Sequence, residues 1–194
     1  MTMRDLRTSD PIRIRALSHP LRLELLDVLA DGPATATECA KATGESVASC
    51  SFHLRSLAKY GYIEPDERRG REKPWKLAYT SRDIRPSEEP ESRRAVGEVA
   101  RLFVDRSVEG IHHWLAEVTD ETLEWINAST VYGSSFWATA DELAELSQSI
   151  QSITAPYRGR NEDPARRPEG SRPITMFAAA HVDVGRERRD RGRT

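Results

Sequence analysis

The chain has 194 residues, of which 31% are charged and 38% hydrophobic, and its formal net charge is −2. This length allows one large domain or two small ones, and the composition excludes fibrous and wholly disordered proteins. Two cysteines are too few for a disulfide framework, the first residues lack the apolar core of a signal peptide, and no run could span a bilayer. We therefore expect a soluble cytoplasmic protein with no membrane partner.

Charge is distributed unevenly along the chain, and the small net value hides this. Five basic residues occur between Glu64 and Lys76, whereas the segment from Glu98 to Glu145 contains ten acidic residues and only two arginines. Such segregation suits a module that meets polyanions joined to a module that must avoid them.

Three short helices are predicted before residue 44, over Ile12–Leu17, Pro20–Ala30 and Thr37–Thr43. Proline suits the first turn of the second helix, and the Asp-Gly-Pro run after residue 30 ends it. For the third helix, Thr37 is the expected N-cap and Gly44 the C-terminal stop. The apolar residues of the second helix recur on one face: Leu21, Leu25, Val28 and Leu29.

A fourth helix is predicted over Ser46–Lys59, with Ser46 as its N-cap and Gly61 as its stop. The residues on the face opposite the apolar one are small and polar, and such a face lets a helix approach base edges and phosphates closely. Its apolar residues fall at helical spacing and should pack on a small core: Val47, Cys50, Leu54, Leu57 and Ala58.

Two short strands should follow, because aromatic and β-branched residues around 62–63 and 75–79 flank a polar turn centred on Gly70. The turn carries Arg68, Arg69, Arg71 and Lys73 against one nearby anion, Glu72. Such a tip suits the phosphate backbone of a nucleic acid. The alternative is an ordinary solvated turn, since basic loops are common on protein surfaces.

The order helix, helix, turn, helix, hairpin predicts a winged helix-turn-helix DNA-binding domain over residues 10–80. Ala16 to Leu77 resembles the winged-helix regulators of the arsenical-resistance-repressor (ArsR) type. The residues that carry the resemblance are Ser18-His19-Pro20-Leu21-Arg22, Ser51-Phe52-His53-Leu54, Leu57, Gly61 and Ile63. The resemblance covers about a third of the chain and implies a dimeric, operator-binding transcriptional regulator, most often a repressor.

The chain departs from that family at the metal site. Many relatives carry two cysteines one residue apart in the third helix, where this chain has only Cys39, and a lone thiol cannot make a tetrahedral thiolate site. His112 and His113 are adjacent and point about 100° apart on a helix. We therefore expect no metal and no cofactor. Cys39 and Cys50 should be small buried apolar residues, with a redox switch as the alternative.

Residues 81–92, rich in proline and acids, are predicted to be a linker. A long helix follows, with an apolar stripe that pairs two copies of the chain or packs on later residues of the same chain. We favour a homodimer. The stripe contains Val96, Val99, Ala100, Phe103, Ser107, Val108, Ile111, Trp114, Leu115 and Val118.

The rest of the chain is predicted to complete a small α+β domain over residues 93–184, which would serve dimerisation and effector binding. We expect helices over Glu121–Ala128 and from Thr139 or Asp141, a strand over Val131–Thr139, a loop, and a buried strand over Pro173–Val184. Residues 185–194 read as a disordered basic tail that adds nonspecific DNA affinity. Trp114, Trp125, Phe136 and Trp137 line a small-molecule effector pocket or form ordinary core.

The sequence thus predicts an α+β protein that regulates transcription, is not an enzyme, and inserts the 46–59 helix into the major groove of an operator. The 64–76 wing would contact flanking phosphates. No catalytic arrangement is visible, and the alternative function is a winged-helix protein-interaction module that does not bind DNA. The expected groove or backbone contacts are Ser46, Ser49, Ser51, His53, Arg55 and Lys59, and the expected wing contacts are Arg68, Arg69, Arg71 and Lys73.

Overall fold

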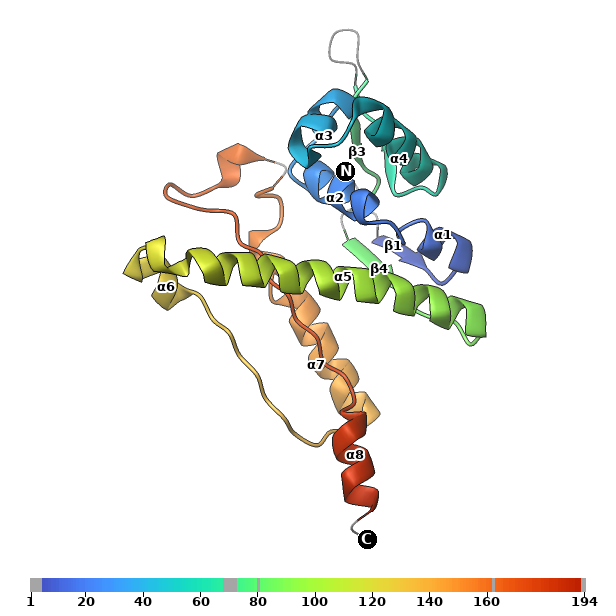
Figure 1. Ribbon diagram of the computed structural model, residues 1–194, viewed down its shortest axis with the longest axis vertical. Coiled ribbons are helices and arrows are strands. Elements are labelled where there is room, and N and C mark those ends of the chain that lie inside the picture. The colour runs from blue at the N-terminus through green and yellow to red at the C-terminus, as the bar shows by residue number, and fades with distance from the viewer. Residues whose placement is uncertain (1–4, 68–72, 80, 162, 193–194) are drawn as a thin grey trace. The chain divides into compact units, whose positions relative to one another are not determined.

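The computed structural model describes residues 5–67, 73–79, 81–161 and 163–192 (Figure 1). The chain divides into two units, residues 1–120 with 161–164, and residues 121–160 with 165–194. None of the described helices is long and apolar enough to cross a membrane.

Four helices open the first unit: α1 (Pro11–Arg15), α2 (Pro20–Ala30), α3 (Ala36–Thr43) and α4 (Val47–Lys59). Their ends follow local side-chain chemistry. Asp10 caps α1, Ser46 caps α4 as predicted, and Gly44 ends α3 with a φ of +74°. The N-cap of α3 is Thr35 rather than Thr37, because Thr35 and Glu38 form a reciprocal capping box two residues earlier.

The core of the first unit lies where α2, α3 and α4 meet. Seven of the residues predicted to be apolar contacts are buried there: Leu21, Leu25, Leu29, Cys39, Cys50, Leu54 and Leu57. Val47 was expected to pack there and is instead 47% exposed. Val47 is the first residue of α4, and the first buried residue of this helix is Cys50. The core therefore does not extend to the N-terminal end of α4.

Two small pairs of strands complete this unit. The wing strands β2 (Ile63–Pro65) and β3 (Trp75–Leu77) are antiparallel, with Ile63 opposite Leu77, and Trp75 also bridges Ala34 ahead of α3. A parallel pair joins β1 (Asp5–Thr8) to β4 (Ser81–Ile84). The predicted linker therefore begins with a strand, which local sequence could not show because its partner lies more than 70 residues away.

Helix α5 (Pro90–Glu117) begins three residues before the predicted domain boundary at 93 and runs across the first unit (Figure 1). Its first half contacts α1 and the core through the buried residues Ala95 and Val99. The buried hydroxyl of Ser92 donates to the Ser9 carbonyl over 2.7 Å and accepts from the Ser87 amide over 3.0 Å. The N-terminal end of α5 is thus fixed to the helix-turn-helix core.

The second unit contains α6 (Leu123–Ala128), α7 (Ala140–Ser152), α8 (Val184–Arg191) and a short 3-10 turn at Ala155–Tyr157. Another 3-10 turn, Pro164–Arg166, crosses the boundary between the units. A further 3-10 turn, Val118–Asp120, closes the first unit after α5. Thr139 caps α7, as predicted.

The strands predicted at Val131–Thr139 and Pro173–Val184 are wrong: both segments are irregular and mostly exposed, and no strand occurs in the described part of this unit. Alternating apolar residues need a partner strand, and none lies beside them. The basic tail forms α8 instead, capped by Asp183.

Candidate nucleic-acid interface

Helix α4 turns one side to the core and the other to solvent. Ser46, Ala48, Arg55 and Lys59 are exposed, and Ser49 and Ser51 are half-buried. Arg55 lies along the exposed side, where one guanidinium nitrogen, Nη1, donates to the Ser51 hydroxyl over 2.9 Å. The Lys59 ammonium lies 5.5 Å from the centre of the Tyr60 ring. Of the predicted groove contacts on α4, only His53 is buried.

His53 was predicted to contact the DNA groove or backbone, but its side chain is only 8% exposed and faces α2. Its Nδ1 accepts a hydrogen bond from Nε of Arg22 over 3.3 Å, and its ring lies 4.2 Å from that of His19. Arg22 is held in turn by a 2.6 Å bond from Nη1 to the Ala16 carbonyl. Burial, followed by His19 and Arg22, lowers the pKa of His53, while Glu45 acts in the opposite direction. His53 positions α4 on α2 as a neutral acceptor.

Phe52 is the outward residue that sequence reasoning missed. Its side chain is 59% exposed on α4, between Ala48 one turn before it and Arg55 one turn after it. The sequence could have predicted this exposure, because Phe52 does not share the helical spacing of the buried residues Cys50, Leu54 and Leu57.

The wing is described only at its base, because Arg68, Arg69 and Arg71 lie outside the described residues. Lys73 is exposed. The charge of Lys76 is balanced inside the hairpin, where its ammonium lies 2.8 Å from Asp66 and 3.9 Å from Glu64. The hydrogen bond to Asp66 is the main cause of the raised pKa of Lys76.

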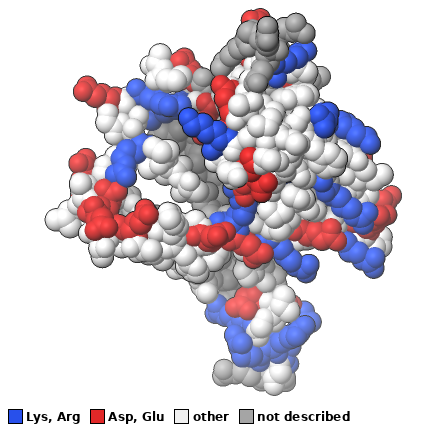
Figure 2. All heavy atoms as spheres, turned by 45° about the horizontal axis from the view of Figure 1, so that its top comes forward, with Lys and Arg blue, Asp and Glu red and all other residues white. Residues whose placement is uncertain are grey.

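Acidic and basic groups are mixed elsewhere on the surface. Figure 2 shows Lys and Arg side chains next to Asp and Glu side chains over most of the face that it presents, and a gathering of Lys and Arg side chains at its lower end. Four arginines of this kind belong to α8: Arg186, Arg188, Arg189 and Arg191.

The two cysteines are buried between α3 and α4, in agreement with the prediction of small apolar residues. Burial, with contributions from Cys50 and Glu38, raises the pKa of Cys39 to about 11. The Thr43 hydroxyl donates to the Cys39 carbonyl over 2.9 Å and lies 3.7 Å from the Cys50 sulfur. A thiol with so high a pKa is a poor nucleophile and metal ligand at neutral pH. Among the described residues, no three His, Cys, Asp or Glu side chains form a metal-binding group.

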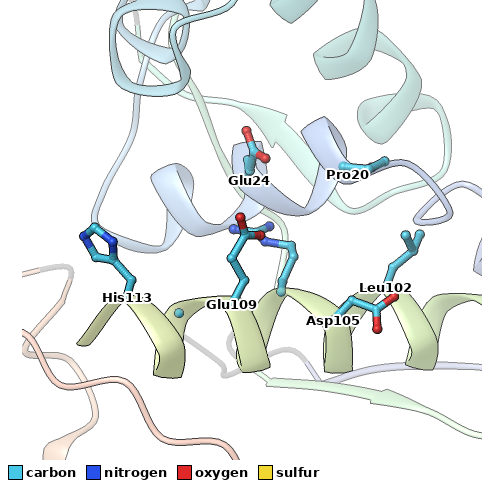
Figure 3. A pocket seen from close by; sticks show the side chains of 8 residues that line it. Pro20, Glu24, Leu102, Asp105, Glu109 and His113 are labelled. Carbon is cyan, nitrogen blue, oxygen red and sulfur yellow. The ribbon is translucent and has the colours of Figure 1, made fainter. Parts of the chain in front are cut away.

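A groove of about 560 Å³ lies between α2 and α5 (Figure 3). Acidic residues from both helices line it, including Glu24 of α2 and Asp105 and Glu109 of α5. Arg106, which also lines it, is paired with Asp27 over 2.8 Å. Nothing in the residue spacing could indicate this groove, because it is formed by helices 70 residues apart.

The four aromatic residues predicted to line an effector pocket are divided between the two units. Trp114 is half-buried on α5 in the first unit, and the other three belong to the second. Phe136 and Trp137 are more than half exposed. The guanidinium of Arg172 lies 4.8 Å from the Trp125 ring centre.

The second half of α5 exposes an apolar stripe. Val104, Val108, Ile111 and Leu115 follow one another at spacings of four, three and four residues, and each is 36–46% exposed. Such spacing places the four side chains along one side of the helix.

Residues 17–65 match the model of a family described as a helix-turn-helix domain. A comparison with curated proteins finds no match. Similar solved structures include the homodimeric winged helix-turn-helix DNA-binding domain of a possible ArsR-family transcriptional regulator from Mycobacterium bovis. It is 27% identical, with a TM-score of 0.33, over 56% of this chain and 83% of that chain.

Adhesin competence repressor from Streptococcus pyogenes is 15% identical, with a TM-score of 0.32, over 72% of this chain and 80% of that chain. The fold class of the first unit rests on the family match and on the elements that the structure shows. Residues 17–65 form a helix-turn-helix domain, which the β2–β3 hairpin completes as a winged helix-turn-helix domain followed by the long helix α5.

Proposed function

We propose that this protein is a sequence-specific DNA-binding transcriptional regulator that inserts α4 into the major groove. The observation that carries the proposal is the two-sided construction of α4. Its inner side is fixed by the buried residues Cys50, Leu54 and Leu57, and its outer side presents Ala48 and Phe52 followed by Arg55 and Lys59. A helix with a packed inner side and two cations on its outer side suits contact with base edges and phosphates.

The hairpin would contact the phosphates that flank the groove. Lys73 is exposed at its base, and the arginines at 68, 69 and 71 occupy the tip in the sequence. Phosphate contacts add affinity without sequence preference, so Lys73→Ala should weaken binding to all duplexes alike and reduce the dependence on salt by about one ion.

In this proposal the protein acts as a homodimer, because α5 exposes the stripe of Val104, Val108, Ile111 and Leu115. Two antiparallel copies of such a stripe can bury each other and present two α4 helices to a two-fold operator. Val108→Glu should convert the dimer to a monomer in size-exclusion chromatography with light scattering. Val131→Glu, at an exposed position of the second unit, is the matched control. A wild-type monomer at micromolar concentration would exclude the dimer.

Binding is tested by fluorescence anisotropy of the full chain with duplexes from its own upstream region and with duplexes selected from a random library. We expect one sequence family to be enriched and its affinity to fall steeply as salt rises. Arg55→Ala should cost about 1–3 kcal/mol on the selected duplex if Arg55 reads a guanine, and should cost equally on random DNA if it contacts phosphate. No enrichment and no salt dependence would favour the alternative, a module that binds protein only.

We further infer that binding represses transcription, and that any small-molecule effector acts through the part of the chain after the wing. An in vitro transcription assay with the selected duplex placed at a promoter measures the sign of regulation. Lower transcript levels with added protein are the expected result, and higher levels would make the protein an activator.

A further inference from the structure

The outer side of α4 changes character along its length. Ala48, Phe52, Arg55 and Lys59 follow at spacings of four, three and four residues, so they share one side of the helix. The first two are apolar and the last two are cations. Helices that read the major groove contact base edges with their N-terminal part, which here presents the apolar pair.

The Phe52 ring packs against the ring of His53. It meets the His53 ring edge-on, with centres 5.1 Å apart and planes at 84°. His53 is buried, accepts a hydrogen bond from Arg22 and lies 4.2 Å from the tilted His19 ring, so the Phe52 ring lies against a side chain that the domain holds in place. A ring supported in this way loses little conformational entropy when it binds.

The chemical groups of the DNA major groove determine which contacts an aromatic ring can make there. Among the groups that base pairs present in the major groove, the 5-methyl of thymine is apolar, and the others are hydrogen-bond donors and acceptors. Phe52 has no hydrogen-bonding group. Arg55 and Lys59, on the same side of α4, place positive charge beside the ring and favour a polyanionic partner over an apolar protein surface.

We propose that Phe52 is a specificity-determining residue of this interface and contacts the 5-methyl group of a thymine in each half-site. The inference rests on the proposed function and deepens it, because it names the base feature that the outer side of α4 selects. The N-terminal part of α4 would thus discriminate by shape and apolar contact, while Arg55 and Lys59 supply charge.

The experiment uses the full chain and a duplex selected from a random library. Each thymine of the selected site is replaced singly by deoxyuridine, which removes the methyl group and keeps the base pair. For the wild type, one replacement per half-site should weaken binding about 4-fold, the effect of exposing one methyl-sized apolar group. For Phe52→Ala the same replacement should have no effect. Phe52→Leu, which keeps an apolar side chain, should retain part of it.

The controls separate the possible failures. Ile153→Ala, which removes another side chain that is 60% exposed, should leave the deoxyuridine penalty unchanged. Circular dichroism checks that Phe52→Ala remains folded, as expected for an exposed position.

If no sequence is enriched, the proposed function itself fails. If a sequence is enriched but no deoxyuridine weakens binding, or the penalty persists in Phe52→Ala, the thymine contact is overturned while DNA binding stands. If Phe52→Ala binds DNA normally but alters the oligomeric state, Phe52 serves a protein contact and the proposal is likewise overturned.

Discussion

The two units of this protein differ in how their helices are held. In the first unit, 18 hydrophobic residues between Ile14 and Val99 are buried in one cluster that joins α1 to α5 and the wing. In the described part of the second unit, no residue is buried. Side-chain caps begin α7 and α8 but not α6, and the side chains of all three helices are half-buried or exposed. Local chemistry alone is enough to end and begin helices, but cooperative stability requires a shared core.

The contrast bears on function, because the proposed DNA contacts lie on the cooperative unit. A reading helix must keep its geometry, and α4 has the packed inner side to do so. The helices of the second unit have no such support within their own unit. Matched substitutions in the two units test this difference directly.

Truncating a core leucine should have the largest effect. Leu25→Ala removes a fully buried side chain of α2 and should lower the free energy of unfolding by about 2–5 kcal/mol. Leu146→Ala, at a half-buried position of α7, should cost less than about 1 kcal/mol. Urea unfolding followed by circular dichroism measures both. Equal losses would show that the second unit has a core of its own.

A glycine pair gives the next contrast. Gly44 and Gly170 both have a φ of +74°, and a Cβ at either position would meet no atom within 4 Å. Alanine at each therefore adds only backbone strain, about 1–2 kcal/mol. We expect Gly44→Ala to lower the unfolding free energy of the first unit by this amount and Gly170→Ala to leave it unchanged. A loss in both variants would mean that the two units unfold together.

Removing the two capping boxes should also affect the two units differently, with a smaller change in stability. Thr35 caps α3 with Glu38, and Thr139 caps α7 with Glu142. Thr35→Ala should cost about 1 kcal/mol of global stability, because α3 is part of the cooperative core. Thr139→Ala should raise hydrogen–deuterium exchange only in peptides of α7. Faster exchange in α2 peptides of the Thr139→Ala variant would contradict the division.

The smallest expected effect is the pH dependence that His53 gives to the stability of the first unit between pH 5 and 7. Because burial, His19 and Arg22 hold the pKa of His53 below its ordinary value of 6.5, the unfolded chain binds this proton more readily than the folded chain. Stability should therefore decrease as the pH falls below about 6.5. His53→Asn, which keeps an acceptor for Arg22, should flatten this slope in urea unfolding at pH 5 to 7, whereas His181→Asn should not. A slope unchanged by His53→Asn would assign it to other groups.

Much of the first unit could be predicted, because its signals are local. Pro20 begins α2, Ser46 caps α4, and Gly44 ends α3 where the sequence indicates. The apolar spacing of Cys50, Leu54 and Leu57 is enough to identify the buried side of α4. Strand predictions after residue 130 failed because alternation describes one strand, whereas a strand exists only when a second one pairs with it.

The sequence by itself determined the helices of the helix-turn-helix, the cap of α4, the glycine that ends α3, and which helix carries the candidate DNA contacts. Tertiary structure decided which side chains actually face outward. It turned His53 inward onto Arg22, left Phe52 and Val47 exposed, and paired β1 with β4 across more than 70 residues. The physical reason is the same in each case: a cap or a turn depends on neighbours within four residues, whereas burial depends on the elements that fold back against a position.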